Sequence, residues 1–269
     1  MVSYAPDLDV LRQTLDSVTR SVVDAKERGS LTRAELYLVD NGPGDEWTER
    51  LSAVLAPLRA DGALEHIELV TGHGNIGFGP GSNLAMTRSD AEFCLVLNPD
   101  VTMEPEAIDQ GLSYLAQHQD ALLVTPRAVW PDGTPQYLCK RYPTVFDLFL
   151  RGFAPEVIKR AFRRRLDSYE MRDVKRDAVT SDVPIASGCF MLVRRAAWQR
   201  VGGFDPAYFL YFEDFDLSVR IRRAGKIAYV PSVRITHRGG GAARKNWRHI
   251  RLFVGSAWVF FNHHGWRWW

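Results

Sequence analysis

The first hundred residues alternate short apolar runs with amphipathic stretches. Between Leu8 and Ala25 the apolar residues recur every three or four positions, which predicts a helix. Further helices are expected over 46–59 and after the glycine-rich stretch that ends at Gly77. Strands are expected at residues 2–4, 35–39, 67–70 and 93–97. This alternation predicts a doubly wound α/β sheet, whose ligand site lies at the carboxyl ends of its strands.

The second half of the chain is less regular. A strand and a Pro/Gly-rich hairpin are expected over 122–143, and residues 151–176 hold nine basic and four acidic side chains with few apolar anchors. We interpret that segment as an exposed or partly mobile helical excursion. Later elements are expected as a strand at 184–193, a helix at 214–224 and a strand at 228–235. The absence of repeats and low-complexity linkers favours a single domain.

Composition narrows the class of protein. Of the 269 residues, 46% are hydrophobic and 25% are charged, which excludes a disordered or fibrous chain. Three scattered cysteines with no zinc-binding spacing indicate a reducing compartment. We expect no secretory leader, because the N-terminus lacks a basic region before an apolar one. The longest apolar run, at 252–261, is too short to span a membrane.

The charge of the chain is unevenly distributed. From Leu217 onward there are eleven Lys or Arg and no acid, whereas the first 216 residues hold 23 basic and 32 acidic side chains. Five of the eight tryptophans lie in the last 23 residues. A basic, aromatic tail on an acidic body indicates a phosphate-rich partner or a membrane surface. A solvated basic helix with some core aromatics is the alternative.

Two loops after predicted strands hold candidate ligand-binding residues. Residues 72–77 match GxGxxG between a strand and a helix, but a dinucleotide fingerprint belongs to a first βα unit, so we disfavour NAD or FAD. The turn Asn98-Pro99-Asp100 follows a buried strand, where a carboxylate can hold a divalent cation or cap the next helix. Asp40 ends another strand, and we expect it to face the same crevice as Asp100.

The segment around Glu213 and Asp214 contains the candidate base. Three acids lie within four residues amid aromatic side chains, and desolvation of an acid raises its pKa toward the range of a general base. The alternative is a favourable place in the first turn of a helix. Asp216 fits that alternative, with Arg220 one turn away as its partner.

A histidine and a glycine run follow the last predicted strand. His237 stands just beyond the strand end, where an imidazole can ligate a metal. The glycines at 239–241 leave backbone N–H groups free to approach phosphate, and Arg244 and Lys245 add positive charge.

Together these segments resemble the inverting GT-A glycosyltransferases of family 2, and within it the bacterial rhamnosyltransferases of O-antigen and cell-wall linkage assembly. The resemblance rests on an ordered set of motifs that spans most of the chain, at residues 39–41, 75–79 with Asn83, 97–101, 140–144, 187–194, 203–205 and 209–220, ending with His237. It implies a GT-A fold, α/β with a mixed central sheet flanked by helices and an amphipathic C-terminal tail. It divides the chain into a nucleotide-sugar half (1–110), an acceptor and catalytic half (111–243) and the tail (244–269).

The resemblance also implies roles for individual residues. Asp214, with Glu213 beside it, matches the acidic pair whose aspartate is the catalytic base, and Asp100 and His237 match a Mg²⁺ or Mn²⁺ site. Ser187 and Gly188 match the acceptor pocket, and we add Lys140 and Arg141 as candidates for a lipid diphosphate. Donor contacts are expected from Tyr4, Asp40, Asn75, Gly77, Phe78, Asn83, Asn98, Asp100 and Arg244.

Two positions depart from the family pattern. Asn98 replaces the first acid of the family's DxD motif, although the subfamily often has Asn-Pro-Asp, and Ala5-Pro6-Asp7 stands where many relatives have a Tyr-Asn turn. With this donor site, the expected reaction moves L-rhamnose from dTDP-L-rhamnose to GlcNAc-diphosphopolyprenol with inversion. A UDP-hexose or UDP-galactofuranose donor, and a non-catalytic sugar-nucleotide or glycan-binding module, are the alternatives.

The tail fits a lipid-linked acceptor. On a helix over 244–261, Trp247, Ile250, Val254, Trp258 and Phe261 fall on one face, with Arg244, Arg248 and Arg251 beside it. Such a helix lies in the headgroup region of a bilayer. We therefore expect a cytoplasmic protein, peripheral on the inner face of the cytoplasmic membrane, with no nucleic-acid partner. A homodimer interface is the alternative use of the stripe.

Overall fold

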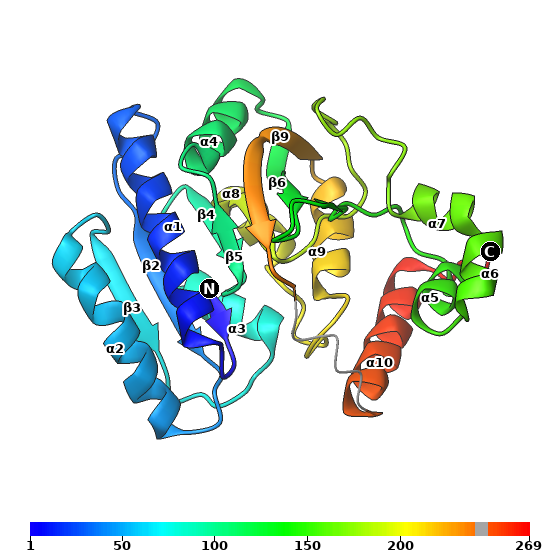
Figure 1. Cartoon of the computed structure of the whole chain (residues 1–269), viewed down its shortest axis with the longest axis horizontal. Helices are drawn as coiled ribbons and strands as arrows, with labels where there is room; N and C mark the ends of the chain where they lie inside the picture. Colours follow the sequence, from blue (N-terminus) through cyan, green and yellow to red (C-terminus); the bar gives the residue numbers. More distant parts are fainter. Residues whose placement is uncertain (240–246) are drawn as a thin grey trace.

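The computed structural model of the chain describes residues 1–239 and 247–269, and it consists of two β-sheets with helices packed on them (Figure 1). The strands are β1 (Val2–Ser3), β2 (Glu35–Asp40), β3 (His66–Val70), β4 (Phe93–Leu97), β5 (Val101–Met103), β6 (Ala121–Val129), β7 (Pro135–Gln136), β8 (Phe190–Arg194) and β9 (Lys226–His237). The helices are α1 (Leu8–Glu27), α2 (Asp45–Asp61), α3 (Phe78–Met86), α4 (Ala107–Gln117), α5 (Val145–Gly152), α6 (Glu156–Ala161), α7 (Arg163–Tyr169), α8 (Arg195–Val201), α9 (Glu213–Arg222) and α10 (Trp247–His264).

The N-terminal sheet is parallel, in the order β1-β2-β3. The Asp7 side chain accepts hydrogen bonds from the backbone N–H groups of Asp9 and Val10, which fixes the start of α1 at Leu8. The helix α2 ends at Gly62, whose φ of 76° is a left-handed conformation. The helices and strands expected up to residue 97 are confirmed, with ends that differ by one or two residues.

The second sheet is mixed, in the order β4-β8-β6-β9-β5, with β7 paired to β6. Strands β6 and β9 run parallel, whereas β8 is antiparallel to both β4 and β6. The first and second sheets divide between residues 70 and 93, because β4 and β5 hydrogen-bond with β8 and β9. The functional division expected at residue 110 stays a prediction. The strands thus form two sheets within the mixed α/β fold expected from the sequence.

Helix α1 joins the two sheets through buried hydroxyl groups. Thr14 donates to the carbonyl oxygen of Pro99 at 3.0 Å, and the hydroxyls of Ser17 and Ser21 accept from the N–H groups of Met103 (3.2 Å) and Ile108 (3.0 Å). All three hydroxyl residues are buried. Their bonds fix the turn that carries Asp100 relative to the N-terminal sheet.

The strand expected at 184–193 begins only at Phe190. Before it, Ile185 makes a single β-bridge to Lys140, and the chain then leaves the sheet. Residues 187–189 instead bond to a helix and a loop: Gly188 N–H donates to Asp214 in the first turn of α9, and the Cys189 carbonyl accepts from Asn98 N–H. The apolar residues of this segment predicted a longer strand, because the hydrophobic pattern contains no information about these tertiary polar contacts.

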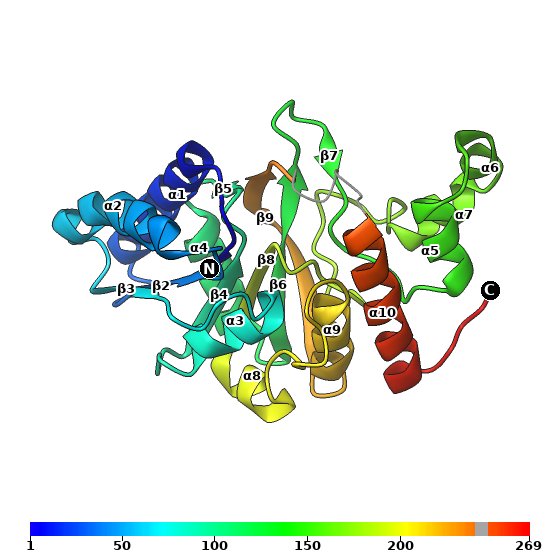
Figure 2. The ribbon, with the colours of Figure 1, turned by 90° about the horizontal axis from the view of Figure 1, so that it is seen from below.

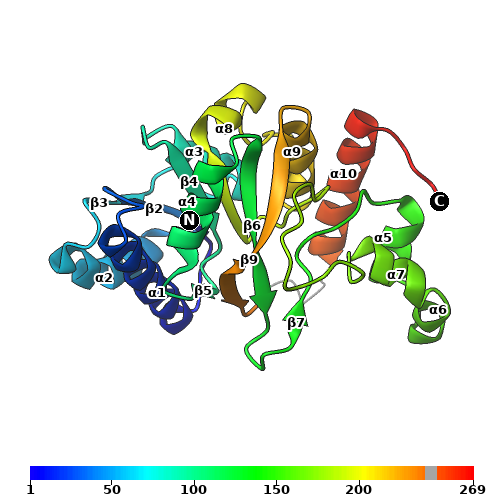
Figure 3. The ribbon, with the colours of Figure 1, turned by 90° about the horizontal axis from the view of Figure 1, so that it is seen from above.

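Helices α5, α6, α7 and α10 lie together beside α9, away from α1 and α2 (Figures 2 and 3). The basic excursion is thus helical, as expected, over α6 and α7. Helix α10 buries Ser256, Phe260 and Phe261, so of the expected apolar stripe only Phe261 is deeply buried. The rest of the stripe stays exposed or half-buried, at Trp247, Ile250, Val254 and Trp258. Among the described helices none is long and apolar enough to cross a bilayer.

Candidate active site

Asp100 and His237 meet where β5 pairs with the end of β9. Val101 pairs with His237 in this ladder, and the His237 Nε2 atom lies 3.5 Å from Asp100 Oδ1. The other carboxylate oxygen of Asp100 accepts from Gly239 N–H at 3.1 Å. Burial acts to raise the pKa of Asp100, but the interactions with His237 and the backbone N–H groups outweigh it and hold that pKa below its ordinary value. Asp100 is therefore a carboxylate at neutral pH.

These two side chains fit a divalent cation that also contacts a diphosphate. His237 Nδ1 lies 3.0 Å from the amide oxygen of Gln136, so with the proton on Nδ1 the lone pair of Nε2 faces Asp100. A spacing of 3.5 Å is longer than a good hydrogen bond and leaves both atoms available as ligands. The Asn98 side chain makes no hydrogen bond within the described residues, so it too is available. Mg²⁺ sites often combine one or two protein carboxylates with substrate phosphates and water.

Glu213 and Asp214 begin α9, directly after a strained turn. Tyr211 and Phe212 have φ angles of 71° and 65°, the left-handed region that bulky residues rarely adopt. The Asp214 carboxylate accepts from the N–H groups of Gly188 and Phe215, each at 2.9 Å. Glu213 is buried, and its Oε2 has no hydrogen-bond partner in the described structure.

The two acids have raised pKa values. Burial, and secondarily the neighbouring Asp214, raise the pKa of Glu213 to about 8. Burial also raises the pKa of Asp214, while backbone N–H donors from Gly188 and Phe215 oppose that rise. Asp214 has these donors and Glu213 Oε2 has none, so of the two acids Asp214 is the one whose ionised form is stabilised by hydrogen bonds. The ionised form is the protonation state that a general base requires.

Residues 187–189 connect the Asp100 turn to the Asp214 helix. Gly188 bonds Asp214, and the next residue, Cys189, accepts from the N–H of Asn98 at 3.0 Å. A side chain at Gly188 would come within 3.2 Å of Phe78 and 3.3 Å of Asp214. The structure thus brings the candidate metal ligand, the candidate base and the candidate acceptor segment to one end of the second sheet.

A cavity of about 410 Å³ opens beside the acidic pair. Glu213 and Asp214 line it together with aromatic and aliphatic side chains from α5, α9 and α10, among them Phe153 and Phe253. Among the described residues that line the cavity, Arg151 supplies the guanidinium group. Its Nε atom lies 3.5 Å from a carboxylate oxygen of Glu170. The sequence analysis missed Arg151, because a basic residue in a basic segment carries no distinguishing signal.

Lys140 and Arg141 do not line this cavity. The Lys140 ammonium is buried, bonds the carbonyl oxygen of Tyr137 and lies 3.9 Å from Glu170. Arg141 makes two hydrogen bonds, at 2.7 and 2.8 Å, to the carboxylate of Asp173. Arg151 also pairs with Glu170, so it is its place in the cavity lining that favours Arg151 over Lys140 and Arg141 for contact with an acceptor.

Close packing explains the glycine at position 77, the last of the glycine-rich loop before α3. Gly77 has a φ of 92°, and a Cβ there would lie 2.3 Å from the carbonyl oxygen of Phe209. The same oxygen accepts from Phe78 N–H, which ties this loop to the turn before Asp214. Asn75 Oδ1 accepts from Gly77 N–H at 3.2 Å, and Asn41 Nδ2 donates to the Gly77 carbonyl at 2.9 Å. Asn41 therefore shapes the loop, a role that the sequence analysis did not assign.

The remaining predicted donor residues occupy different settings. Asp40 ends β2 and accepts from Gly42 N–H and the Thr48 hydroxyl, whereas Tyr4 is half exposed. Both ends of the Asn83 amide bond the backbone of Phe204, so this residue fixes α3 to the loop before α9. Its donor contact stays a prediction, as do those of Tyr4 and Asp40. Arg244 lies outside the described residues.

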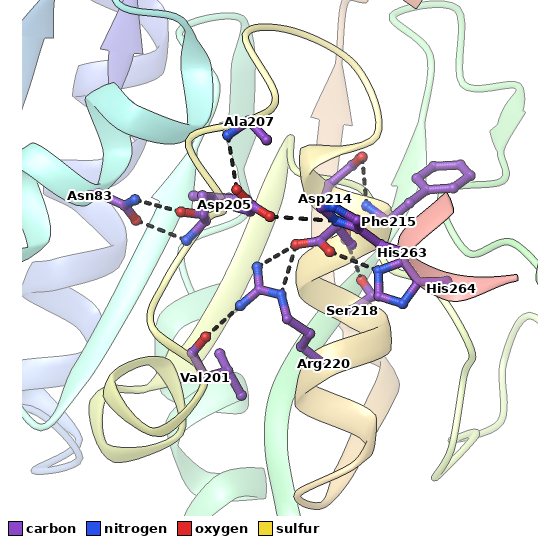
Figure 4. A network of polar contacts seen from close by, with 12 residues as sticks. Asn83, Val201, Asp205, Ala207, Asp214, Phe215, Ser218, Arg220, His263 and His264 are labelled. Carbon is purple, nitrogen blue, oxygen red and sulfur yellow. Dashed lines mark hydrogen bonds and ion pairs between the residues drawn. The ribbon is translucent and has the colours of Figure 1, made fainter. Parts of the chain in front are cut away.

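A buried polar network holds α10 against α9 (Figure 4). Asp216 accepts from Arg220 Nε at 2.8 Å, which confirms the expected pair, and from His264 Nε2 at 2.7 Å. A cation could be held by the closely spaced ligand atoms of Asp205, Asp216 and His263. However, Asp216 already binds the guanidinium of Arg220 and the imidazole of His264. We interpret this network as a structural connection that fixes one wall of the cavity.

The mixed α/β fold and this site define the class of GT-A glycosyltransferases. In agreement, the sequence profile described as "Glycosyltransferase like family 2" matches residues 12–253, and the chain belongs to that family. A solved structure with a similar fold is that of GalNAc-T7 with UDP, GalNAc and Mn²⁺. It has a TM-score of 0.53 and 14% sequence identity, covering 76% of this chain and 37% of that longer one.

Curated relatives are more similar in sequence. The N-acetylglucosaminyl-diphospho-decaprenol L-rhamnosyltransferase of Mycobacterium tuberculosis is 28% identical over 246 residues, which cover 86% of this chain and 76% of that protein. The rhamnosyltransferase WbbL of Escherichia coli is 28% identical over 177 residues, 61% of each chain. The low-salt glycan biosynthesis hexosyltransferase Agl10 of Haloferax volcanii is 24% identical over 196 residues, 71% of this chain and 54% of that one.

Proposed function

We propose that the protein transfers L-rhamnose from dTDP-L-rhamnose to a hydroxyl of a GlcNAc-diphosphopolyprenol lipid, with inversion at the anomeric carbon. The observation that carries the proposal is the position of Asp214, which lines a cavity of about 410 Å³ and is joined through Gly188 to the segment that bonds the Asp100 turn. The proposed sugar follows two relatives that are rhamnosyltransferases, and the proposed acceptor follows the mycobacterial N-acetylglucosaminyl-diphospho-decaprenol L-rhamnosyltransferase.

Asp214 acts as the base in the proposed reaction. Its carboxylate takes the proton of the acceptor hydroxyl, whose oxygen attacks the anomeric carbon from the face opposite the nucleotide. The bond between that carbon and the diphosphate oxygen breaks, and its electron pair leaves with the nucleotide. One displacement therefore inverts the anomeric centre. The Gly188 and Phe215 N–H groups hold the Asp214 carboxylate in place before and after it is protonated.

Asp100 and His237 would hold the divalent cation, with Asn98 beside them. A bound Mg²⁺ or Mn²⁺ supplies positive charge that offsets the charge growing on the departing diphosphate. The chain itself contributes Gly239 N–H, which fixes one Asp100 oxygen, and Gln136, which orients the His237 ring. In this scheme residues 1–110 contribute the donor site and 111–243 the base and acceptor site.

The acceptor fits the cavity by its chemistry. A GlcNAc-diphosphopolyprenol presents a sugar hydroxyl, two phosphates and an apolar chain in that order. The cavity presents Asp214, the guanidinium of Arg151 and the aromatic rings of Phe153 and Phe253. We assign the diphosphate to Arg151, because this cation lines the same cavity as the base. This assignment replaces Lys140 and Arg141, which do not line the cavity.

Calorimetric titration tests the donor and the metal together. The purified protein is titrated with dTDP-L-rhamnose, UDP-hexoses and UDP-galactofuranose, with Mg²⁺, Mn²⁺ or EDTA. Binding of dTDP-L-rhamnose that needs the metal, and its loss in Asp100→Ala, is expected. Tighter binding of a UDP-sugar would replace the donor and leave the site in place. Equal binding in EDTA would contradict the metal site, and transfer with retention in the product would contradict the mechanism.

A further inference from the structure

A group of exposed apolar and basic side chains borders the cavity, and apart from Arg151 and Phe153 the proposed reaction does not use it. It comprises residues 149–164, from the second half of α5 through the start of α7, and we call it the 149–164 knob. Val157 is 78% exposed and Phe153 is 51% exposed, and Phe149 and Ile158 are exposed as well. Soluble surfaces tolerate single exposed apolar residues, whereas several on one short segment mark a surface that binds a partner.

The basic residues of the knob indicate what that partner is. Arg160 and Arg164 are exposed and make no ion pair within the described residues, and Lys159 beside them is half-buried and also unpaired. The one acid between Phe149 and Arg164 is Glu156. Apolar side chains flanked by unpaired cations complement a bilayer that contains anionic lipid, since the rings and branched chains enter the headgroup boundary and the cations contact phosphates.

The position of the knob ties it to the cavity. Phe153 both lines the cavity and is half exposed. The opposite wall is formed by Ile250 and Phe253 in the first turns of α10, next to the exposed Trp247. In the ribbon views α5, α6 and α10 lie at the same end of the molecule, opposite α2 (Figures 1 and 2). Exposed apolar groups therefore stand on both sides of the cavity.

We propose that the 149–164 knob is a membrane-binding element that inserts Phe153, Val157 and Ile158 into an anionic bilayer. It holds the cavity at the level of the lipid headgroups, so that a lipid-linked acceptor reaches Asp214 without leaving the membrane. The proposal deepens the proposed function at the acceptor side and rests on it for the identity of the lipid substrate. The binding of the knob to bilayers does not depend on the proposed function.

Sedimentation with vesicles tests the binding directly. The whole protein is mixed with vesicles of phosphatidylcholine alone or of phosphatidylcholine with about 30% phosphatidylglycerol, which makes the surface anionic. Val157→Asp is expected to weaken partitioning roughly tenfold, because one apolar contact is lost and a charge is added. Arg160→Gln with Arg164→Gln should reduce the preference for anionic vesicles by about fivefold per residue, and high salt should mimic that loss.

Matched controls lie at the other end of the molecule. Val23→Asp changes an exposed valine on α1, and Arg20→Gln with Arg59→Gln removes two exposed, unpaired arginines of α1 and α2. These variants should bind vesicles as the wild type does. Equal binding by Val157→Asp and Val23→Asp, or no binding by the wild type, would overturn the proposal. So would a change from dimer to monomer in Val157→Asp, since the knob would then contact a second copy.

Two transfer assays separate this inference from the proposed function. With a short-chain, water-soluble acceptor the Val157→Asp variant should turn over as the wild type does, and with an acceptor embedded in vesicles it should be slower by about the loss in partitioning. Equal slowing with both acceptors would mean a damaged site and would overturn the membrane role. Vesicle binding that depends on Val157 in a protein without transferase activity would uphold the knob and reject the function.

Discussion

The backbone N–H of Gly188 donates a 2.9 Å hydrogen bond to the carboxylate of Asp214. One residue further on, the Cys189 carbonyl accepts from Asn98, so this short segment sets the base relative to the Asp100 turn. Gly188 is suited to the position because its missing side chain leaves room for Phe78 and Asp214. Several properties of the site depend on this contact.

Alanine at position 188 should perturb the base. Its Cβ would lie 3.2 Å from Phe78 and 3.3 Å from Asp214, so one of them must move. We expect kcat to fall by about tenfold or more, since a small misplacement of a catalytic group is costly, with a stability loss of about 1 kcal/mol. Gly255→Ala, in a helix position with open space around it, is the control and should be neutral or stabilising. Unchanged kcat in Gly188→Ala would show that the contact does not position the base.

Asp214→Asn should abolish most of the transfer. An amide cannot accept the hydroxyl proton, so kcat should drop roughly 10²–10⁴-fold, while calorimetry should show unchanged donor binding. Asp182→Asn is the control, because this carboxylate is exposed and pairs with Arg222 outside the cavity. Turnover near the wild-type rate in Asp214→Asn would assign the base elsewhere.

The raised pKa of Asp214 should appear in the pH–rate profile. Because burial disfavours its charged form, the acidic limb of kcat should fall at a higher pH than that of an ordinary aspartate, whose pKa is about 3.9. Measuring kcat across the acidic range with a soluble acceptor tests this expectation. An acidic limb at or below the ordinary value would contradict a desolvated base.

Glu213 should make folding stability depend on pH. Its folded-state pKa of about 8 lies above the unfolded value of 4.5, so the folded chain keeps a proton that the unfolded chain releases. Its contribution is complete below pH 4.5 and is lost as pH rises through about 8. Relative to Glu213→Gln, the wild type should lose up to about 1.4 kcal/mol per pH unit across that window. Parallel denaturant titrations of both proteins at several pH values measure it, and identical pH slopes would refute the assignment.

Arg151 should act on the acceptor and not on the donor. Arg151→Ala should raise KM for a diphosphate-bearing acceptor by about tenfold to a hundredfold, the scale of a charge-assisted contact of about 1.5–3 kcal/mol, and leave donor affinity unchanged. Arg151→Lys should restore part of the loss. Arg141→Ala is the control, because its guanidinium is bound to Asp173 away from the cavity. An equal rise in KM for Arg141→Ala would favour the original assignment of the diphosphate to the 140–141 pair.

The sequence by itself determined the elements and the chemistry that they carry. Three- and four-residue spacing predicted α1, unbroken apolar runs predicted β4, and the motifs around Asp100, Asp214 and His237 placed acids and an imidazole at the ends of predicted elements. The Asp216–Arg220 pair was also predictable, because residues four apart on a helix are neighbours. Local periodicity suffices wherever the partners are close in the chain.

Only the tertiary structure decided which distant residues meet. The contact between Gly188 and Asp214 joins residues 26 apart, and His264 reaches Asp216 across 48 residues. On α10, four of the five residues of the expected stripe stay exposed or half-buried, whereas Phe261 packs into the core beside Phe260. The free energy of such contacts comes from desolvation and packing between elements that are far apart in the sequence. The spacing of residues within one element therefore does not predict them. The sequence motifs identified the candidate base, and the tertiary structure placed the cavity beside it.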